Sequence, residues 1–210
     1  MADPTPARRL APGATVTPHQ FVAISGESVE VPDPGQMVHL ELRRFAGCPI
    51  CNLHLRSVVM RKDELAAAGI KEVVVFHSTD EELRKYQTEL PLAVIADPEK
   101  KLYAEFGVER SPRAVLNPGA WPAIARGLGH SVSAVIRRKE KAPPVVHENG
   151  SLGLPGDFLI ASDGHVIASK YGTHAFDQWT VDEVLALAGS QAAGNEAAKA
   201  AATPNAPISS

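Results

Sequence analysis

The sequence predicts an α/β fold, with a central mixed sheet flanked by helices, an N-terminal β-hairpin and an insertion before the late strands. Short apolar runs typical of buried strands alternate along the chain with segments of helical spacing. This order favours parallel strands covered on both faces. A hairpin signal late in the chain adds two antiparallel strands. The length of 210 residues suits one such domain with additions.

The first elements are bounded by clear local signals. Residues 16–31 predict a β-hairpin, and residues 37–45 alternate apolar with polar side chains, which predicts a strand with one apolar face. Pro49 suits the first position of the helix that follows, and Gly69 suits its end. The apolar run 73–76 is typical of a buried parallel strand.

The later elements follow the same alternation. We expect a helix that begins near Ser78 with capping-box spacing, a strand at 92–96, a short helix at 102–106, antiparallel strands at 158–161 and 166–171, and a last helix at 181–187.

Composition divides the chain into one domain and two tails. Residues 1–14 are rich in Pro and Ala and predict a disordered arm, and residues 190–210 predict a disordered Ala-rich tail. The domain predicted between them covers residues 15–189. Within it, residues 109–153 hold several Pro and Gly and predict an insertion of loops.

Charge and hydropathy exclude several classes of partner. The net charge of −3 gives no general attraction to nucleic acid or to an acidic membrane surface. No apolar run is long enough to span a bilayer, and no apolar stretch follows Arg8 and Arg9 as an export signal would require. The sequence therefore predicts a cytoplasmic protein with neither nucleic acid nor membrane as partner.

The two cysteines, Cys48 and Cys51, are the strongest chemical signal in the chain. In a reducing compartment, a disulfide that closes so short a loop has little value as a structural crosslink. Gly47 breaks the preceding strand and Pro49 opens a helix, so Cys48 lies at a helix N-terminus, where unpaired N–H groups and the helix dipole stabilise a thiolate. Cys51 follows one turn later, within reach of a disulfide, and is the candidate resolving thiol.

The two cysteines admit two other interpretations. Cys48, Cys51 and His54 have a zinc-like spacing, but a zinc site needs four ligands and the sequence offers no third cysteine or evident fourth ligand. Haem attachment needs a histidine where Asn52 stands. The sequence thus predicts no metal and no cofactor, and two inert buried cysteines remain an alternative.

Two residues far from the cysteines are candidates for support of the site. Pro155 precedes the strand at 158–161, where a cis proline could face the cysteine pair, or where it could be a plain loop proline. His77 ends the strand at 73–76 and could assist proton transfer at Cys48, or could be a polar residue beside a helix cap.

Four segments give the chain a resemblance to a known family. They are Arg44-Phe-Ala-Gly-Cys-Pro-Ile-Cys51, Val73-Val-Val-Phe-His-Ser78, Val94-Ile-Ala-Asp-Pro98 and Leu154-Pro-Gly-Asp-Phe-Leu-Ile160. Residues 37–115 and 151–188 resemble the peroxiredoxin-like branch of the alkyl hydroperoxide reductase/thiol-specific antioxidant family. The resemblance implies a thioredoxin-like fold, antioxidant thiol chemistry, a peroxide or disulfide substrate and a thiol electron donor such as the thioredoxin or glutathione system. A homodimer is one possible assembly.

The chain departs from that family's motif at three places. Cys48-Pro49 matches its end, but Phe45 stands at the Thr/Ser position and Glu41 at the leading Pro position. The family's late active-site Arg is absent, and Arg44 or Arg113 could replace it in space. A peroxidase needs polar groups that stabilise the charge developing on the peroxide.

Three functions remain open from the sequence. The first is a thiol peroxidase in which Cys48 becomes a sulfenic acid and Cys51 closes an intramolecular disulfide. The second is a thioredoxin- or glutaredoxin-like disulfide reductase that uses the same pair. The third is a redox sensor or binding module without turnover. Besides the cysteines, the candidate site residues are Arg44, Phe45, Gly47, Pro49, His77 and Pro155.

Overall fold

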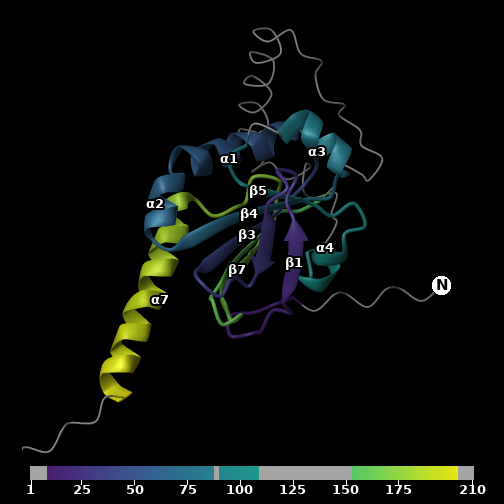
Figure 1. The fold of residues 1–210 in the computed structure, drawn as a ribbon. Coiled ribbons are helices and arrows are strands. Elements are labelled where there is room, and N and C mark those ends of the chain that lie inside the picture. The colour runs from purple at the N-terminus through teal and green to yellow at the C-terminus, as the bar shows by residue number, and fades with distance from the viewer. Residues whose placement is uncertain (1–8, 88–89, 109–152, 203–210) are drawn as a thin grey trace, which may run out of the picture.

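The computed structural model describes residues 9–87, 90–108 and 153–202, and Figure 1 shows their arrangement. In chain order the elements are β1 (His19–Val22), β2 (Ser28–Val31), β3 (Met37–Arg43), α1 (Pro49–Met60), α2 (Lys62–Ala67), β4 (Ile70–Phe76), α3 (Asp80–Gln87), β5 (Ala93–Ala96), α4 (Lys101–Glu105), β6 (Gly156–Ile160), β7 (Val166–Tyr171) and α7 (Val181–Ala202). The predicted insertion at 109–153 lies outside the described residues except for Gly153.

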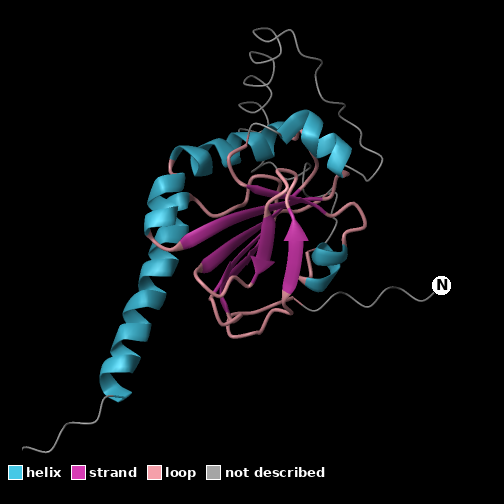
Figure 2. Ribbon diagram, in the orientation of Figure 1, coloured by secondary structure: helices cyan, strands magenta, loops and turns pink. Residues whose placement is uncertain are grey.

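The five-stranded sheet has the order β5-β4-β3-β6-β7, with β1 and β2 in a separate antiparallel hairpin. Strands β3, β4 and β5 are parallel, whereas β6 and β7 pair antiparallel. Figure 2 shows the helices around this sheet. The predicted mixed sheet, its flanking helices and its N-terminal hairpin are therefore confirmed.

One face of the sheet packs against the N-terminal hairpin and α4. The core on this face includes Val38, Leu40 and Leu42 of β3. Val29 and Val31 of the hairpin strand β2 belong to the same core and pack against them. The fixed alternation of side chains along a strand explains this pattern, since every second residue of β3 points to the same face.

The other face carries the functional features and is covered by helices. Below α1 and α3 lies an apolar cluster that includes both cysteines, and below α2 and α7 lies a second one that includes Trp179. The intervening residues of β3 are His39, Glu41 and Arg43, which are exposed by 1%, 0% and 0%. The prediction of one apolar face on this strand is confirmed, and its polar face is buried under helices as well.

Local sequence explains where the helices begin and break. Helix α1 ends before Arg61, which separates it from α2. At α3, the Thr79 hydroxyl accepts a hydrogen bond from the N–H of Glu82, and the Glu82 carboxylate accepts one from the N–H of Thr79. This reciprocal pair is the predicted capping box.

Both ends of the described chain differ from the expected disorder. Helix α7 continues to Ala202 and extends past the sheet (Figure 1), because alanine has the highest intrinsic helix propensity. Near the N-terminus, the carbonyl of Leu10 accepts hydrogen bonds from Ser169 and Tyr171 of β7. Residues 1–8 and 203–210 lie outside the described part.

No helix among the described residues is both long and apolar enough to cross a bilayer.

Candidate active site

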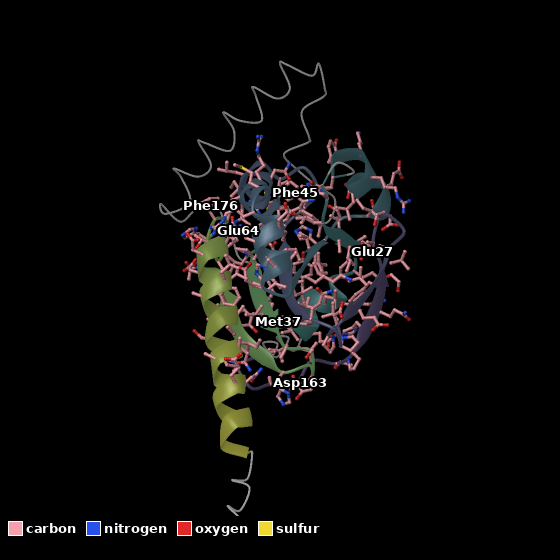
Figure 3. All side chains as sticks on the ribbon, turned by 60° about the vertical axis from the view of Figure 1, so that its left-hand side comes forward. Glu27, Met37, Phe45, Glu64, Asp163 and Phe176 are labelled. Atoms are coloured by element: carbon pink, nitrogen blue, oxygen red, sulfur yellow. The ribbon has the colours of Figure 1, made fainter. Side chains whose placement is uncertain are left out.

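Cys48 is the N-cap residue of α1, at the end of the sheet where β3 finishes. Gly47 has φ 74°, a conformation that glycine adopts without strain, and it turns the chain from β3 into the helix. Pro49 occupies the first turn of α1, as predicted. Figure 3 shows Phe45 near the top of the molecule and Asp163, in the turn between β6 and β7, near the bottom. The cysteines therefore lie at the end opposite to that turn.

The Cys48 sulfur receives two kinds of stabilising contact. It accepts a hydrogen bond from the backbone N–H of Cys51 at 3.4 Å. The Arg44 guanidinium donates to the same sulfur, with 3.8 Å between Nη1 and Sγ. Both cysteines are free thiols, and they are exposed by 0% and 1%. Both contacts favour a negative charge on Cys48.

The two thiols differ in acidity. Burial raises the pKa of Cys48, but a hydrogen bond from the Cys51 thiol, the charge of Arg44 and the N–H groups of Cys51 and Ile50 outweigh it and lower the pKa to about 7. Burial raises the pKa of Cys51, and the neighbouring Cys48 raises it further. This asymmetry favours a thiolate at Cys48 and a protonated thiol at Cys51.

Aromatic side chains surround the Arg44–Cys48 contact. The Arg44 guanidinium lies over the Phe45 ring, 5.2 Å from its centroid, and the rings of Phe45 and His77 are 6.4 Å apart. The backbone N–H of His77 donates to the carbonyl of Arg44 at 3.1 Å. The structure thus places Arg44, Phe45 and His77 around the cysteines.

Two further residues complete this surrounding shell and were missed by the sequence analysis. The Ser78 hydroxyl accepts a hydrogen bond from the backbone N–H of Ala46 at 3.0 Å, which fixes the loop before Cys48. At Gly153, an added Cβ would lie 3.3 Å from His77 Nε2 and 3.7 Å from Arg44 Cγ. The capping-box spacing indicated a different role for Ser78, and no local pattern marked Gly153.

Pro155 does not have the cis peptide bond that the sequence analysis considered. Among the described residues, the cis bond is Val31–Pro32. The Pro155 carbonyl accepts from the N–H of Gly172 at 2.9 Å, and its ring packs where a Gly172 side chain would otherwise project. The segment before β6 approaches the site through Gly153 instead.

Buried charges extend below the cysteines on the same face of the sheet. Arg43 Nη2 donates to Asp157 Oδ1 at 2.7 Å and also to Glu41. His39 Nδ1 lies 2.8 Å from Glu72 Oε2. Burial opposes a charge on His39, but the carboxylates of Glu72, Asp157 and Glu41 raise its pKa to about 10. We call His39, Glu41, Arg43, His54, Glu72 and Asp157 the buried charge cluster.

The parallel β3-β4-β5 strands, the antiparallel β6-β7 pair and a Cys-x-x-Cys pair at a helix start define a protein of the thioredoxin-like class. The family model of the AhpC/TSA antioxidant enzyme matches residues 58–174. The chain therefore belongs to the AhpC/TSA antioxidant enzyme family, whose general chemistry is thiol-dependent oxidation and reduction. The matched segment begins after the cysteines, so their role rests on the geometry described above.

Solved structures confirm the fold. The peroxidoxin BcpB from Mycobacterium tuberculosis matches with a TM-score of 0.61 at 15% identity, over 87% of this chain and 98% of that one. The reduced 2-Cys peroxiredoxin of Plasmodium vivax matches with a TM-score of 0.62 at 10% identity, over 89% and 84% of the two chains. A candidate thiol:disulfide interchange protein, DsbE, from Chlorobium tepidum matches with a TM-score of 0.54 at 17% identity, over 86% and 99%. No curated protein matches by sequence.

Proposed function

We propose that this chain is a thiol-dependent peroxidase in which Cys48 attacks a hydroperoxide and Cys51 resolves the product. The observation that carries the proposal is the Cys48 sulfur at the start of α1, with the Arg44 guanidinium 3.8 Å away. The unit that acts is the single domain predicted at residues 15–189.

The reaction begins with the Cys48 thiolate. Its sulfur forms a bond to the terminal oxygen of ROOH while the O–O bond breaks, and the RO⁻ that leaves takes up a proton to become an alcohol. Cys48 is then a sulfenic acid. Arg44 is suited to stabilise charge in this step, because its guanidinium already lies beside the sulfur.

Cys51 completes the cycle. After losing its proton, it attacks the Cys48 sulfur, so that an S–S bond forms and hydroxide leaves as water. An external thiol donor, for which the thioredoxin and glutathione systems are candidates, reduces the disulfide. The raised pKa of Cys51 suits this order, since Cys51 stays protonated while Cys48 reacts first.

In this proposal, Arg44 takes the place of the late active-site arginine of the family's motif as the positive charge beside Cys48. The sequence lacks the late arginine of that motif, and Phe45 replaces its hydroxyl residue. Burial also favours a small oxidant, because a sulfur exposed by 0% is reached more easily by a peroxide than by a protein disulfide. We therefore rank peroxidase above disulfide reductase.

The second candidate function is disulfide exchange with the same cysteines. The observation that favours it is Phe45, which places a ring and not a hydroxyl three residues before Cys48. A ring offers no hydrogen bond to orient a peroxide. The wild-type rate with peroxide relative to the rate with a small disulfide decides between the two functions.

Stopped-flow oxidation of the reduced protein by hydrogen peroxide and, in parallel, by glutathione disulfide tests the proposal. We expect fast loss of thiol with peroxide, absent in Cys48→Ser, and a sulfenic acid that persists in Cys51→Ser and can be trapped by dimedone. Rapid exchange with glutathione disulfide and slow reaction with peroxide would establish the reductase instead. Oxidation that is not followed by turnover with a thiol donor would indicate a sensor.

A further inference from the structure

We propose that the buried charge cluster holds a divalent transition-metal ion, with His39, Glu41 and Glu72 as ligands and His54 as the fourth. This site is separate from the cysteines and does not depend on the proposed peroxidase. It lies between the two apolar clusters on the helix-covered face of the sheet.

Strand register brings the first three ligands together. His39 and Glu72 are paired across β3 and β4, and Glu41 follows two residues after His39, on the same side of β3. One donor atom from each of the three lies within 4.8 Å of the others. In a tetrahedral site with ligands bound at about 2.0–2.2 Å, the donor atoms lie about 3.3–3.6 Å apart. Donors at the outer limit of 4.8 Å would therefore need to close by about 1.2 Å or more.

His54 adds a second imidazole from α1. Its Nε2 lies 3.3 Å from Glu41 Oε2, the carboxylate oxygen that Arg43 also contacts, so His54 stands next to Glu41 on the side of the oxygen that the ion would not use. His54 is exposed by 7%, and the other three ligands by 8% or less. Two imidazoles and two carboxylates without thiolate favour Zn²⁺, Fe²⁺, Mn²⁺ or Co²⁺ over Ca²⁺ or Mg²⁺, which prefer oxygen ligands alone.

Several buried atoms of these ligands have no hydrogen-bond partner among the described residues. They are His39 Nε2, Glu41 Oε1, His54 Nε2 and Glu72 Oε1. Of these, His39 Nε2 lies 3.5 Å from Asp157 Oδ1 and His54 Nε2 lies 3.3 Å from Glu41 Oε2, within ion-pair distance. Native proteins rarely leave such atoms without a partner, because each one costs the free energy of its lost hydration. A metal ion would satisfy donors of this type together.

The charge of the cluster also matches a divalent ion. Glu41, Glu72 and Asp157 carry three negative charges when ionised, and Arg43 carries one positive charge. Metal ligands must be neutral imidazoles, so the ion would displace the proton that the carboxylates otherwise hold on His39, and the net charge with both histidines neutral is −2. Arg43 binds Asp157 Oδ1 and Glu41 on one side, which leaves Glu41 Oε1 for the ion.

The test must separate this site from the cysteines, which also bind soft metals. We would therefore use the full chain with Cys48→Ser and Cys51→Ser, treated with a chelator that is then removed, and titrate it with Co²⁺ and with Zn²⁺. We expect one ion per chain by calorimetry, a visible Co²⁺ spectrum without sulfur charge transfer, paramagnetic shifts of two imidazole signals and a melting temperature that rises with metal concentration.

Variants in the same background assign the ligands. Glu72→Gln and His54→Gln should each weaken binding at least tenfold, whereas His19→Gln should leave it unchanged, since His19 pairs with Glu105 outside the cluster. Circular dichroism checks that each variant is folded, and the imidazole shifts identify the ligands without any variant. Failure of the folded cysteine-free chain to bind either ion would overturn the proposal. Binding that only the cysteines confer, or that neither ligand variant weakens, would overturn it as well.

Discussion

The Arg44 guanidinium donates to the Cys48 sulfur across 3.8 Å, and both residues belong to the short loop between β3 and α1. The turn at Gly47 makes this possible, because it folds the loop back on itself before the helix begins. The positive charge is thus supplied by a neighbour in the sequence. The pair explains how a buried sulfur can be ionised near neutral pH.

The first prediction concerns the pH dependence of Cys48 modification. With a pKa of about 7, about half of Cys48 is thiolate at pH 7, against about 1% for a thiol at its ordinary value of 9.0. The rate of alkylation by iodoacetamide, followed by mass spectrometry at Cys48, should rise through a midpoint near pH 7. Cys51 in the same digest should show no increase in that range. A midpoint for Cys48 near pH 9 would contradict the assigned thiolate.

The second prediction tests the contribution of Arg44. Arg44→Met should raise the midpoint of Cys48 by about one pH unit or more, because an opposite charge close to a thiolate is lost. Arg44→Lys should raise it less, since it keeps the charge. The rate of reaction with hydrogen peroxide at pH 7 should fall about tenfold or more in Arg44→Met.

Arg56→Met is the matched control for this experiment. Arg56 lies exposed on α1, so its removal should change neither the midpoint nor the rate. Equal midpoints for Arg44→Met and Arg56→Met would show that Arg44 does not stabilise the thiolate. Circular dichroism of each variant separates this result from a loss of fold.

The core of the candidate site could be predicted from the sequence because it is local. Residues 44–51 follow one another, and a strand end, a glycine turn and a helix start fix their relative positions. The sheet followed in the same way from apolar runs and a hairpin signal. The sequence offered Arg44 and Arg113 as candidates for the positive charge near Cys48. It could not decide between them, because the direction of the Arg44 side chain depends on the turn at Gly47.

The rest depended on contacts between distant segments. Glu72 meets His39 only because of the parallel register of β3 and β4, which no local pattern of residues specifies. His39, Glu41 and Arg43 alternate as an exposed strand face would, and only the helices packed over them bury that face. Gly153 likewise contacts His77 and Arg44 across the fold.

The third prediction concerns the stability of the buried charge cluster. Arg43 is fully buried and binds Glu41 and Asp157, so Arg43→Met leaves two carboxylates without their cation. Removal of one partner of a buried ion pair costs about 3–5 kcal/mol of unfolding free energy. Urea unfolding followed by circular dichroism measures the loss.

Arg61→Met serves as the comparison for that measurement. Arg61 donates to Glu64 and Asp182 at the surface, where water and salt screen the charges. Its replacement should change the urea midpoint far less than Arg43→Met does. Similar losses for the two variants would argue against a buried network at Arg43.

The last prediction compares two glycine positions near the end of the chain. At Gly172, an added Cβ would lie 2.5 Å from Pro155 Cγ and 2.8 Å from the carbonyl oxygen of Asp177, so part of the backbone must move. Gly172→Ala should therefore lower the free energy of unfolding by about 1–3 kcal/mol. Gly189 lies within α7 with no atom within 4 Å of an added Cβ, and Gly189→Ala should raise the free energy by about 0.5–1 kcal/mol through helix propensity. Urea unfolding of both variants measures the two changes. If Gly172→Ala is as stable as the wild type, Pro155 does not pack closely against Gly172. The described path of the chain from Pro155 into β6 would then be contradicted as well.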